Sequence, residues 1–259
     1  MSQVRIAVQL QPQHAEYGAI RDAVAEAEAM GVDIAYNWDH FFPLNGDPDG
    51  KHFECWTMLG AWAEQTSRIQ IGALVACNSY RNPQLLADMA RTVDHISGGR
   101  LILGLGAGWF EKDYDEYGYD FATAGTRLAH LAEALPAIEA RLARLNPAPT
   151  RAIPLLIGGG GERKTLRLVA RHANTWHAFG NAATLAHKSA VLDRWCAEVD
   201  RSPDEIERST GVRATAPPES ADAIYDLGFR QFTVGLSGPE YNMAAVSDWL
   251  AWRDEKNRG

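Results

Sequence analysis

The chain has 259 residues, 46% of them apolar and 22% charged, which is enough apolar material for a large core and excludes a disordered or fibrous protein. Its formal net charge of −8 argues against nucleic acid or an anionic membrane as a partner. Three widely spaced cysteines without a C-x-x-C pair exclude a disulfide framework and a structural zinc site. Residues 1–10 show no basic leader before an apolar stretch, so we expect a cytoplasmic protein.

Short runs rich in strand-forming residues alternate with helical patterns along the first half of the chain. The strand-like runs are 4–10, 33–38, 68–76 and 100–106. Apolar residues at helical spacing follow at 20–30, 55–67, 83–96 and 128–145. We expect Gly31 to end the first helix, Asn82 and Pro83 to begin the third, and Pro136 to kink the fourth.

The same alternation continues through the second half, less clearly after residue 200. Strands are predicted at 153–158, 174–179, 206–214 and 229–236, each followed by a helix, at 163–172, 183–200, 219–227 and 240–256. Eight strand–helix units at this length predict an α/β protein that forms one (β/α)8 TIM barrel, a single domain over residues 1–259. Ligands bind such barrels just after the strands, so the expected site uses residues 39–40, 77–79, 106–109, 158–161, 176–177 and 235–237.

A run of four glycines, residues 158–161, joins the fifth predicted strand to a helix. A P-loop needs Lys directly after the last glycine, whereas Glu162 and Arg163 precede Lys164, and no G-x-G-x-x-G occurs in this run or at 104–108. Bare backbone N–H groups at a helix N-terminus, with Arg163 and Lys164 close by, suit one phosphate of a ligand. A tight connection without a ligand is the alternative.

Asp39 and His40 follow the second predicted strand and are flanked by Trp38, Phe41 and Phe42. A histidine can exchange a proton near neutral pH, and a neighbouring carboxylate can orient it. The alternative is a histidine packed among aromatic rings with one ordinary hydrogen bond. No H-x-H or H-x-x-x-H spacing occurs, so we expect no metal site.

Residues 104–121 combine glycines with six aromatic side chains and several acidic ones. Such a segment either covers a flat ring system and keeps water out, or only caps one end of the barrel. Within it, Glu111 and Tyr114 rank behind His40 as residues that handle a proton.

Several stretches together resemble the luciferase-like monooxygenase superfamily, and within it the branch that uses the deazaflavin coenzyme F420. The resemblance rests on WDHF (38–41), on NSYRNPQLLADMARTVDHISGGRLILGLGAGW (78–109), on EYG (116–118) and on PLLIGGGGERKTLRLVARHANTWH (154–177). The two long segments are specific together, and the resemblance spans nearly the whole chain. It implies a (β/α)8 barrel with an isoalloxazine-like ring at the C-terminal mouth.

By this resemblance the expected cofactor is F420, with FMN as the alternative. His40 is then the catalytic, proton-handling residue, Asp39 is its catalytic neighbour, and the glycine run holds the phosphate of the coenzyme's side chain. A non-prolyl cis peptide that supports the ring in similar enzymes matches the Cys77–Asn78 bond. The expected cofactor-binding residues are Asp39, His40, Ala76, Cys77, Asn78, Gly106, Ala107, Gly108, Gly158, Gly159, Gly160, Gly161, Arg163 and Trp176.

Two departures from the family pattern limit the expected chemistry. The sugar-phosphate dehydrogenases of the branch carry an acidic residue where this chain has Trp109, so their reaction is not expected here. The connection at 146–152 is too short for a hairpin that relatives share, which leaves the roof of the pocket open to variation.

The expected activity is therefore that of an F420-dependent oxidoreductase, which transfers a hydride between the deazaflavin and a small organic substrate. Two alternatives are an FMN-dependent luciferase-like monooxygenase and a flavin-binding protein without turnover. The expected partners are the small-molecule substrate and a second copy of the chain, because dimers are common among similar proteins.

Overall fold

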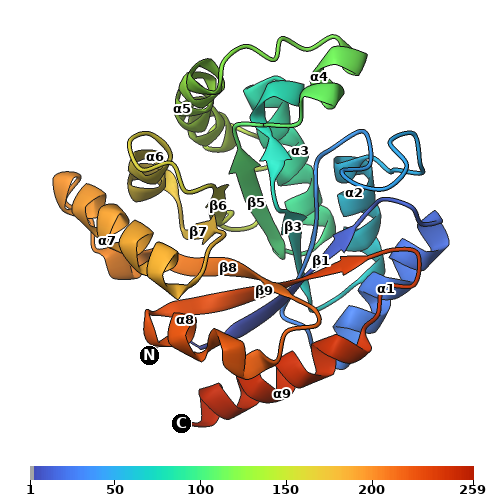
Figure 1. Cartoon of the computed structure of the whole chain (residues 1–259). Coiled ribbons are helices and arrows are strands. Elements are labelled where there is room, and N and C mark those ends of the chain that lie inside the picture. The colour runs from blue at the N-terminus through green and yellow to red at the C-terminus, as the bar shows by residue number, and fades with distance from the viewer. Residues whose placement is uncertain (1–2) are drawn as a thin grey trace.

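The computed structural model describes residues 3–259, in which parallel strands form a barrel surrounded by helices (Figure 1). The first half contains β1 (Arg5–Gln11), α1 (Tyr17–Met30), β2 (Ile34–Asn37), α2 (Cys55–Gln65), β3 (Gln70–Ala73), β4 (Ala76–Cys77), a 3-10 turn (Asn78–Tyr80), α3 (Pro83–Ile96), β5 (Leu101–Gly106) and α4 (Glu111–Tyr117). The second half contains α5 (Ala124–Leu142), β6 (Leu155–Gly158), α6 (Thr165–His172), β7 (Thr175–Ala178), α7 (Ala182–Glu198), β8 (Glu207–Arg213), α8 (Asp222–Asp226), β9 (Phe229–Ser237) and α9 (Ala244–Arg258), with 3-10 turns at Pro203–Glu205 and Pro218–Ala221.

The barrel is closed by the pairing of β3 with β5. Ile71 lies opposite Leu101 in this pair, and β1 joins β2 to β9. The short β4 pairs with β5 alone and continues the line of β3. β3 and β4 are two parts of one stave, which makes eight parallel staves within residues 3–259. The predicted (β/α)8 barrel is confirmed.

Local signals place several helix ends where they were predicted. Gly31 ends α1 with a φ of +84°, a left-handed conformation that favours glycine. The Asn82 side chain accepts hydrogen bonds from the N–H groups of Gln84 and Leu85 and so begins α3. Pro136 lies inside α5, and the kink expected there stays a prediction.

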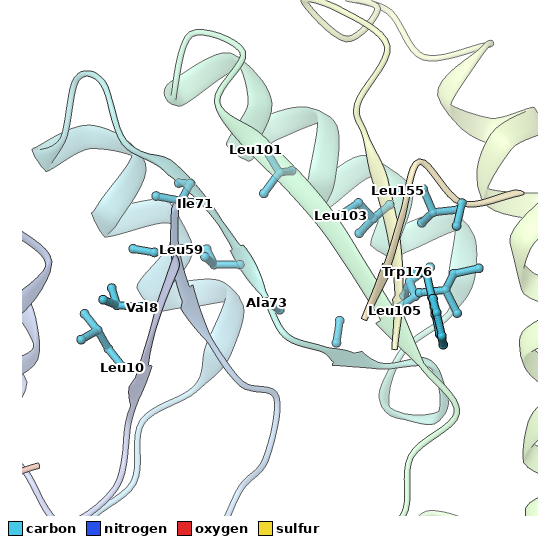
Figure 2. Packing of buried hydrophobic residues seen from close by; sticks show 14 of the residues in the cluster. Val8, Leu10, Leu59, Ile71, Ala73, Leu101, Leu103, Leu105, Leu155 and Trp176 are labelled. Atoms are coloured by element: carbon cyan, nitrogen blue, oxygen red, sulfur yellow. The ribbon is translucent and has the colours of Figure 1, made fainter. Parts of the chain in front are cut away.

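Side chains alternate between two layers along each strand. On β5, Leu101, Leu103 and Leu105 face outward and pack with the helix layer (Figure 2), whereas Ile102 belongs to the small cluster inside the barrel. This alternation decides which residues near the end of a strand can reach a ligand at the mouth.

The floor of the barrel is polar. The Arg5 guanidinium pairs with the Glu207 carboxylate and donates to the Oε1 atoms of Gln70 and Gln231, at 2.6 and 3.2 Å. Burial lowers and the Glu207 charge raises the pKa of Arg5, with a net upward shift, so this cation stays charged. None of the helices within residues 3–259 is both long and apolar enough to cross a membrane.

Candidate functional site

A cavity of about 510 Å³ opens at the carboxyl ends of the strands. It lies where ligands bind barrels of this kind, and apolar side chains make up much of its wall. The residues that line it are Gln9, Trp38, Asp39, His40, Leu44, Leu74, Val75, Cys77, Gly106, Ala107, Gly108, Trp109, Ala124, Arg127, Leu128, Gly158, Gly159, Thr165, His177 and Phe179.

His40 enters this cavity directly after β2 and is held from behind by Asp113 of α4. The Nδ1 atom of His40 lies 2.7 Å from Asp113 Oδ2, and the other carboxylate oxygen accepts from the backbone N–H groups of Phe41 and Phe42, at 3.0 and 3.2 Å. The Tyr80 hydroxyl donates to the same carboxylate at 2.9 Å. An ionised carboxylate only accepts, so His40 carries its proton on Nδ1 and turns Nε2 to the cavity.

Three aromatic rings surround His40. The rings of Trp38, Trp109 and Phe110 each meet the imidazole edge-on, at centroid distances of 5.9, 5.7 and 5.6 Å. The wall expected from Phe41 and Phe42 is not formed, because Phe41 turns away and stacks on Tyr117 at 4.0 Å. Trp109 and Phe110, from residues 104–121, supply the missing rings. Tyr114, Tyr119 and Phe121 of the same segment pack around Tyr80 and Cys77 instead.

Asp39 does not orient His40, which corrects the expected pairing of these neighbours. Its buried carboxylate accepts from the Cys77 N–H at 2.9 Å and pairs with the Arg81 guanidinium, whose Nη2 lies 3.1 Å from Oδ1. Arg81 also reaches Glu54 at 3.3 Å. Asp39 therefore fastens the end of β2 to β4, and the carboxylate that holds the histidine is that of Asp113.

The non-prolyl cis peptide lies at Leu74–Val75, so the prediction of Cys77–Asn78 is wrong. The third stave breaks earlier than the apolar run GALVAC suggests, since β3 ends at Ala73 and the chain resumes as β4 at Ala76. Ala76 is buried in the outer core. Asn78 lines a different, more exposed hollow, together with His130 and Glu133.

Val75 forms a platform at the back of the cavity, between two glycines. A Cβ added to Gly106 would lie 2.5 Å from Val75 Cγ2, and one added to Gly158 would lie 2.9 Å from Cγ1. Gln9 supports the same segment, since its Nε2 donates to the Leu74 carbonyl at 2.7 Å. These close approaches explain the glycines at both positions.

The remaining glycines of the run differ in what surrounds them. Gly159 has a φ of +126°, and a Cβ on Gly161 would lie 2.7 Å from Thr165 Oγ1. Gly160 is open, with Lys188 Cε at 3.8 Å as the nearest atom that a Cβ would meet. Within residues 3–259 the N–H groups of Gly160 and Gly161 have no hydrogen-bond acceptor, which suits an anion at the start of α6. Gly158 and Gly159 line the cavity, whereas Gly160 and Gly161 lie outside its wall.

Two cations lie near the start of α5, one of which also stands next to the glycine loop in the sequence. Arg127 of α5 is buried and donates to the carbonyl of Gly108 at 3.1 Å and to those of Phe121 and Ala122 at 2.6 and 2.9 Å. Lys164 donates to the Gly125 carbonyl at 3.2 Å and thereby joins the starts of α5 and α6. Arg163 is exposed and does not line the cavity.

On β7 the inward residue is His177, not Trp176. Trp176 belongs to the outer layer, where Figure 2 shows it beside Leu105 and Leu155, and its Nε1 donates to the Gly159 carbonyl at 2.8 Å. His177 lines the cavity, and burial lowers its pKa to about 4. Trp176 thus supports the glycine loop from behind while its neighbour faces the ligand space.

Two other polar groups near the cavity are held in their neutral forms. The Cys77 thiol lies 3.3 Å from the Tyr114 hydroxyl. Burial raises the pKa of Cys77 and that of Tyr114, so neither ionises near pH 7. Glu111, another expected proton donor, is exposed and absent from the cavity wall.

Sequence reasoning missed Asp113 and left His177 unassigned. Asp113 stands among Glu111, Asp115 and Glu116, which together look like one solvated acidic face, and only the phase of α4 buries one of the four. Within residues 3–259 no three His, Cys, Asp or Glu side chains gather into a group that could hold a metal ion.

Comparison with known proteins yields one family model and several relatives. The model, described as luciferase-like monooxygenase, matches residues 1–258. An uncharacterized protein of Mycobacterium tuberculosis is 30% identical over 225 residues, which cover 79% of each chain. The F420-dependent glucose-6-phosphate dehydrogenase of Amycolatopsis mediterranei is 30% identical over 181 residues, 61% of this chain and 52% of that protein.

Solved structures share the fold at low sequence identity. An F420-dependent secondary alcohol dehydrogenase in complex with an F420-acetone adduct superposes with a TM-score of 0.85 at 15% identity, over 96% of this chain and 97% of that one. The FMN-bound oxygenating constituent of 3,6-diketocamphane monooxygenase from Pseudomonas putida gives a TM-score of 0.76 at 15% identity, over 99% and 98%. At these identities the likeness establishes the barrel alone.

Proposed function

The chain belongs to the luciferase-like monooxygenase family, and from this premise we propose that it is an F420-dependent oxidoreductase acting on a small organic substrate. The dehydrogenase relative and the alcohol dehydrogenase structure, both named as F420-dependent, support this cofactor. The observation that carries the proposal is a cavity lined on one side by His40, which Asp113 holds, and on another by Gly158 and Gly159 at the start of the loop with free N–H groups.

The residues present fit a deazaflavin. Val75 offers an apolar support, and Gly106 and Gly158 leave room for its two methyl groups. The free N–H groups of Gly160 and Gly161 precede the start of α6, where the helix dipole favours an anion such as a phosphate. Lys164 stands at the same place with a positive charge.

A bound deazaflavin supplies hydride transfer at a ring carbon. The chain then has to move one proton at the substrate, and His40 Nε2 is the group placed to do so, because Asp113 holds its Nδ1. The rings of Trp38, Trp109 and Phe110 keep water from the imidazole. Arg127 ties the two ends of the segment from Gly108 to Ala122 to α5 through three carbonyls and so helps to hold Trp109 over the site.

A second candidate is an FMN-dependent monooxygenase on the same barrel, which the FMN-bound diketocamphane monooxygenase favours. The two candidates differ in what the reduced cofactor does, since a reduced flavin consumes oxygen and a reduced deazaflavin reacts poorly with it. A third, flavin binding without turnover, keeps the cofactor but needs no proton-handling residue.

Parallel titrations of the purified protein with F420 and with FMN, followed by fluorescence, test the proposal. We expect micromolar or tighter binding of F420, weaker binding of FMN, and no oxygen uptake by the reduced complex. Preferential FMN binding with oxygen uptake would replace the proposal by the monooxygenase. If F420 binds but no alcohol or other hydride donor in a substrate screen reduces it, the third candidate, a binding protein without turnover, is supported instead.

A further inference from the structure

His177 is the second histidine of the cavity, and it stands on the wall opposite His40. It belongs to β7, which lies four staves from β2 in either direction around the barrel. Its side chain is 2% exposed, and its Nε2 has no hydrogen-bond partner within residues 3–259. A buried nitrogen without a partner at a cavity wall marks a place where a ligand is expected.

The floor of the barrel determines how a chain of hydrogen bonds runs up to this ring. Arg5 only donates, and its Nη2 lies 3.2 Å from Gln231 Oε1, so the oxygen of that amide faces Arg5. The Nε2 of Gln231 is therefore turned the other way. It donates to Ser209 Oγ at 3.0 Å and to the Tyr36 hydroxyl at 3.2 Å.

The Ser209 hydroxyl links Gln231 to His177 and donates its hydrogen bond toward the histidine. Its oxygen already accepts from Gln231, and within residues 3–259 its own hydroxyl hydrogen has one acceptor, the Nδ1 of His177 at 2.8 Å. A neutral imidazole that accepts at Nδ1 carries its proton at Nε2. The ring of this cavity-lining residue thus carries a buried Nε2–H that has no partner within residues 3–259. Burial also lowers its pKa and keeps the ring neutral.

We propose that the Nε2–H of His177 is a hydrogen-bond donor for a neutral carbonyl or alcohol oxygen of the ligand bound in the cavity. The inference rests on the proposed function, because that oxygen belongs either to the substrate or to the bound ring of the cofactor. A donor that carries no charge suits a neutral acceptor in an apolar pocket. Phe179, which also lines the cavity, has its ring edge-on to that of His177 at 5.0 Å.

The tautomer can be measured in the wild-type protein without a ligand. Imidazole 15N chemical shifts, with His177 assigned by its absence from the His177→Gln spectrum, distinguish a protonated Nε2 from a protonated Nδ1. We expect protonated Nε2 and bare Nδ1 for this ring from pH 5.5 to 8. A proton on Nδ1, or titration of the ring near pH 6.5, would overturn the inference.

The source of the oxygen is found by adding ligands to the same sample. A shift of the Nε2 resonance with F420 alone assigns the acceptor to the cofactor, and a shift that needs cyclohexanone as well assigns it to the substrate. If F420 does not bind, the proposed function fails while His177 can still be tested, because FMN and cyclohexanone carry the same kind of oxygen. A resonance that none of the three moves rejects the donor role.

Substitution gives a second readout. His177→Leu removes the donor and should weaken binding of the oxygen-bearing ligand by about 2- to 10-fold, the usual net effect of one hydrogen bond. His177→Gln places an amide N–H near the same point and should stay within about threefold of the wild type. His95→Gln, at an exposed site on α3, is the matched control. Equal losses for Leu and Gln at position 177 would indicate a packing role and contradict the proposal.

Discussion

His40 and His177 face the same cavity from opposite walls, and the atom behind each ring makes them differ. Behind His40 stands a carboxylate, which only accepts, so Nδ1 keeps its proton and Nε2 offers a lone pair. Behind His177 stands a hydroxyl that donates, so Nδ1 is bare and Nε2 carries the proton. The group that positions an imidazole thus decides whether the ring takes a proton or only binds an acceptor.

The largest expected effect is the loss of turnover when His40 is removed. His40→Ala should lower turnover by roughly 10²–10⁴, the usual range for loss of a general acid or base, and leave F420 affinity within a few-fold. Paired binding titrations and rate assays measure both quantities, with His95→Ala as the control. Undiminished turnover would mean that His40 serves as packing and that the two walls do not differ in role.

Two aspartates allow the partner of His40 to be tested by matched substitutions. Asp113→Asn removes the anion behind the ring and should lower turnover by about 10–100-fold, with an altered pH–rate profile. Asp39→Asn breaks the buried pair with Arg81 instead and should reduce the free energy of unfolding by about 3–5 kcal/mol. Urea unfolding and pH–rate profiles of both variants check this. Exchange of the two outcomes would restore Asp39 as the orienting residue.

Acid should destabilise the fold because His177, on the wall opposite His40, is buried in its neutral form. His177 has a pKa of about 4 in the folded protein, whereas an unfolded histidine titrates near 6.5. Between these values the unfolded chain binds a proton that the native state does not, so stability falls as pH drops from about 6.5 to 4, by about 3 kcal/mol in all. His52, whose pKa burial also lowers to about 4, adds to the same window.

Urea unfolding at pH 7, 5.5 and 4.5 measures this loss. His177→Gln has no proton to gain at position 177, so its free energy of unfolding should fall less steeply with acid than that of the wild type. Parallel curves for the two proteins would contradict the prediction, because they would show that His177 takes up a proton as readily in the folded protein as in the unfolded chain.

The smallest expected effect concerns cofactor binding at the glycine loop, away from both histidines. Gly160→Val adds a side chain to the open position of the loop and should weaken F420 binding more than tenfold, about 1.4 kcal/mol or more, because it covers the free N–H groups. Gly159→Val is the poorer test, since its φ of +126° strains any side chain there. Unchanged affinity in a folded Gly160→Val protein would make the run a tight connection only.

The order and ends of most elements were predictable because they depend on local chemistry. The strand–helix alternation, the Gly31 stop and the Asn82 cap follow from residues within a few positions of each other. The break inside the third stave was not predictable, since residues 72–77 read as one apolar run. What interrupts that run is the packing of Val75 against β5 and β6, two distant segments.

The site, like the fold, combines features that depend on local sequence with features that depend on distant segments. The position of His40 after β2 follows from the sequence, but its partner lies 73 residues away and looks like one solvated acid among several. Which of Trp176 and His177 faces the cavity depends on the phase of β7, and a shift by one residue exchanges the two faces. The tautomer of His177 depends on residues of β1, β8 and β9, which only the closed barrel brings together.

Val75 and the two glycines beside it constrain how this site can evolve. A Cβ at position 106 or 158 would lie closer than 3 Å to a methyl group of Val75, so a side chain at either position requires a change at Val75 as well. The rings of Trp109 and Phe179 are 62% and 75% exposed at the cavity, and substitutions there disturb little packing. A descendant of this protein can therefore acquire a different substrate by single mutations at the mouth while its support for a bound ring is inherited unchanged.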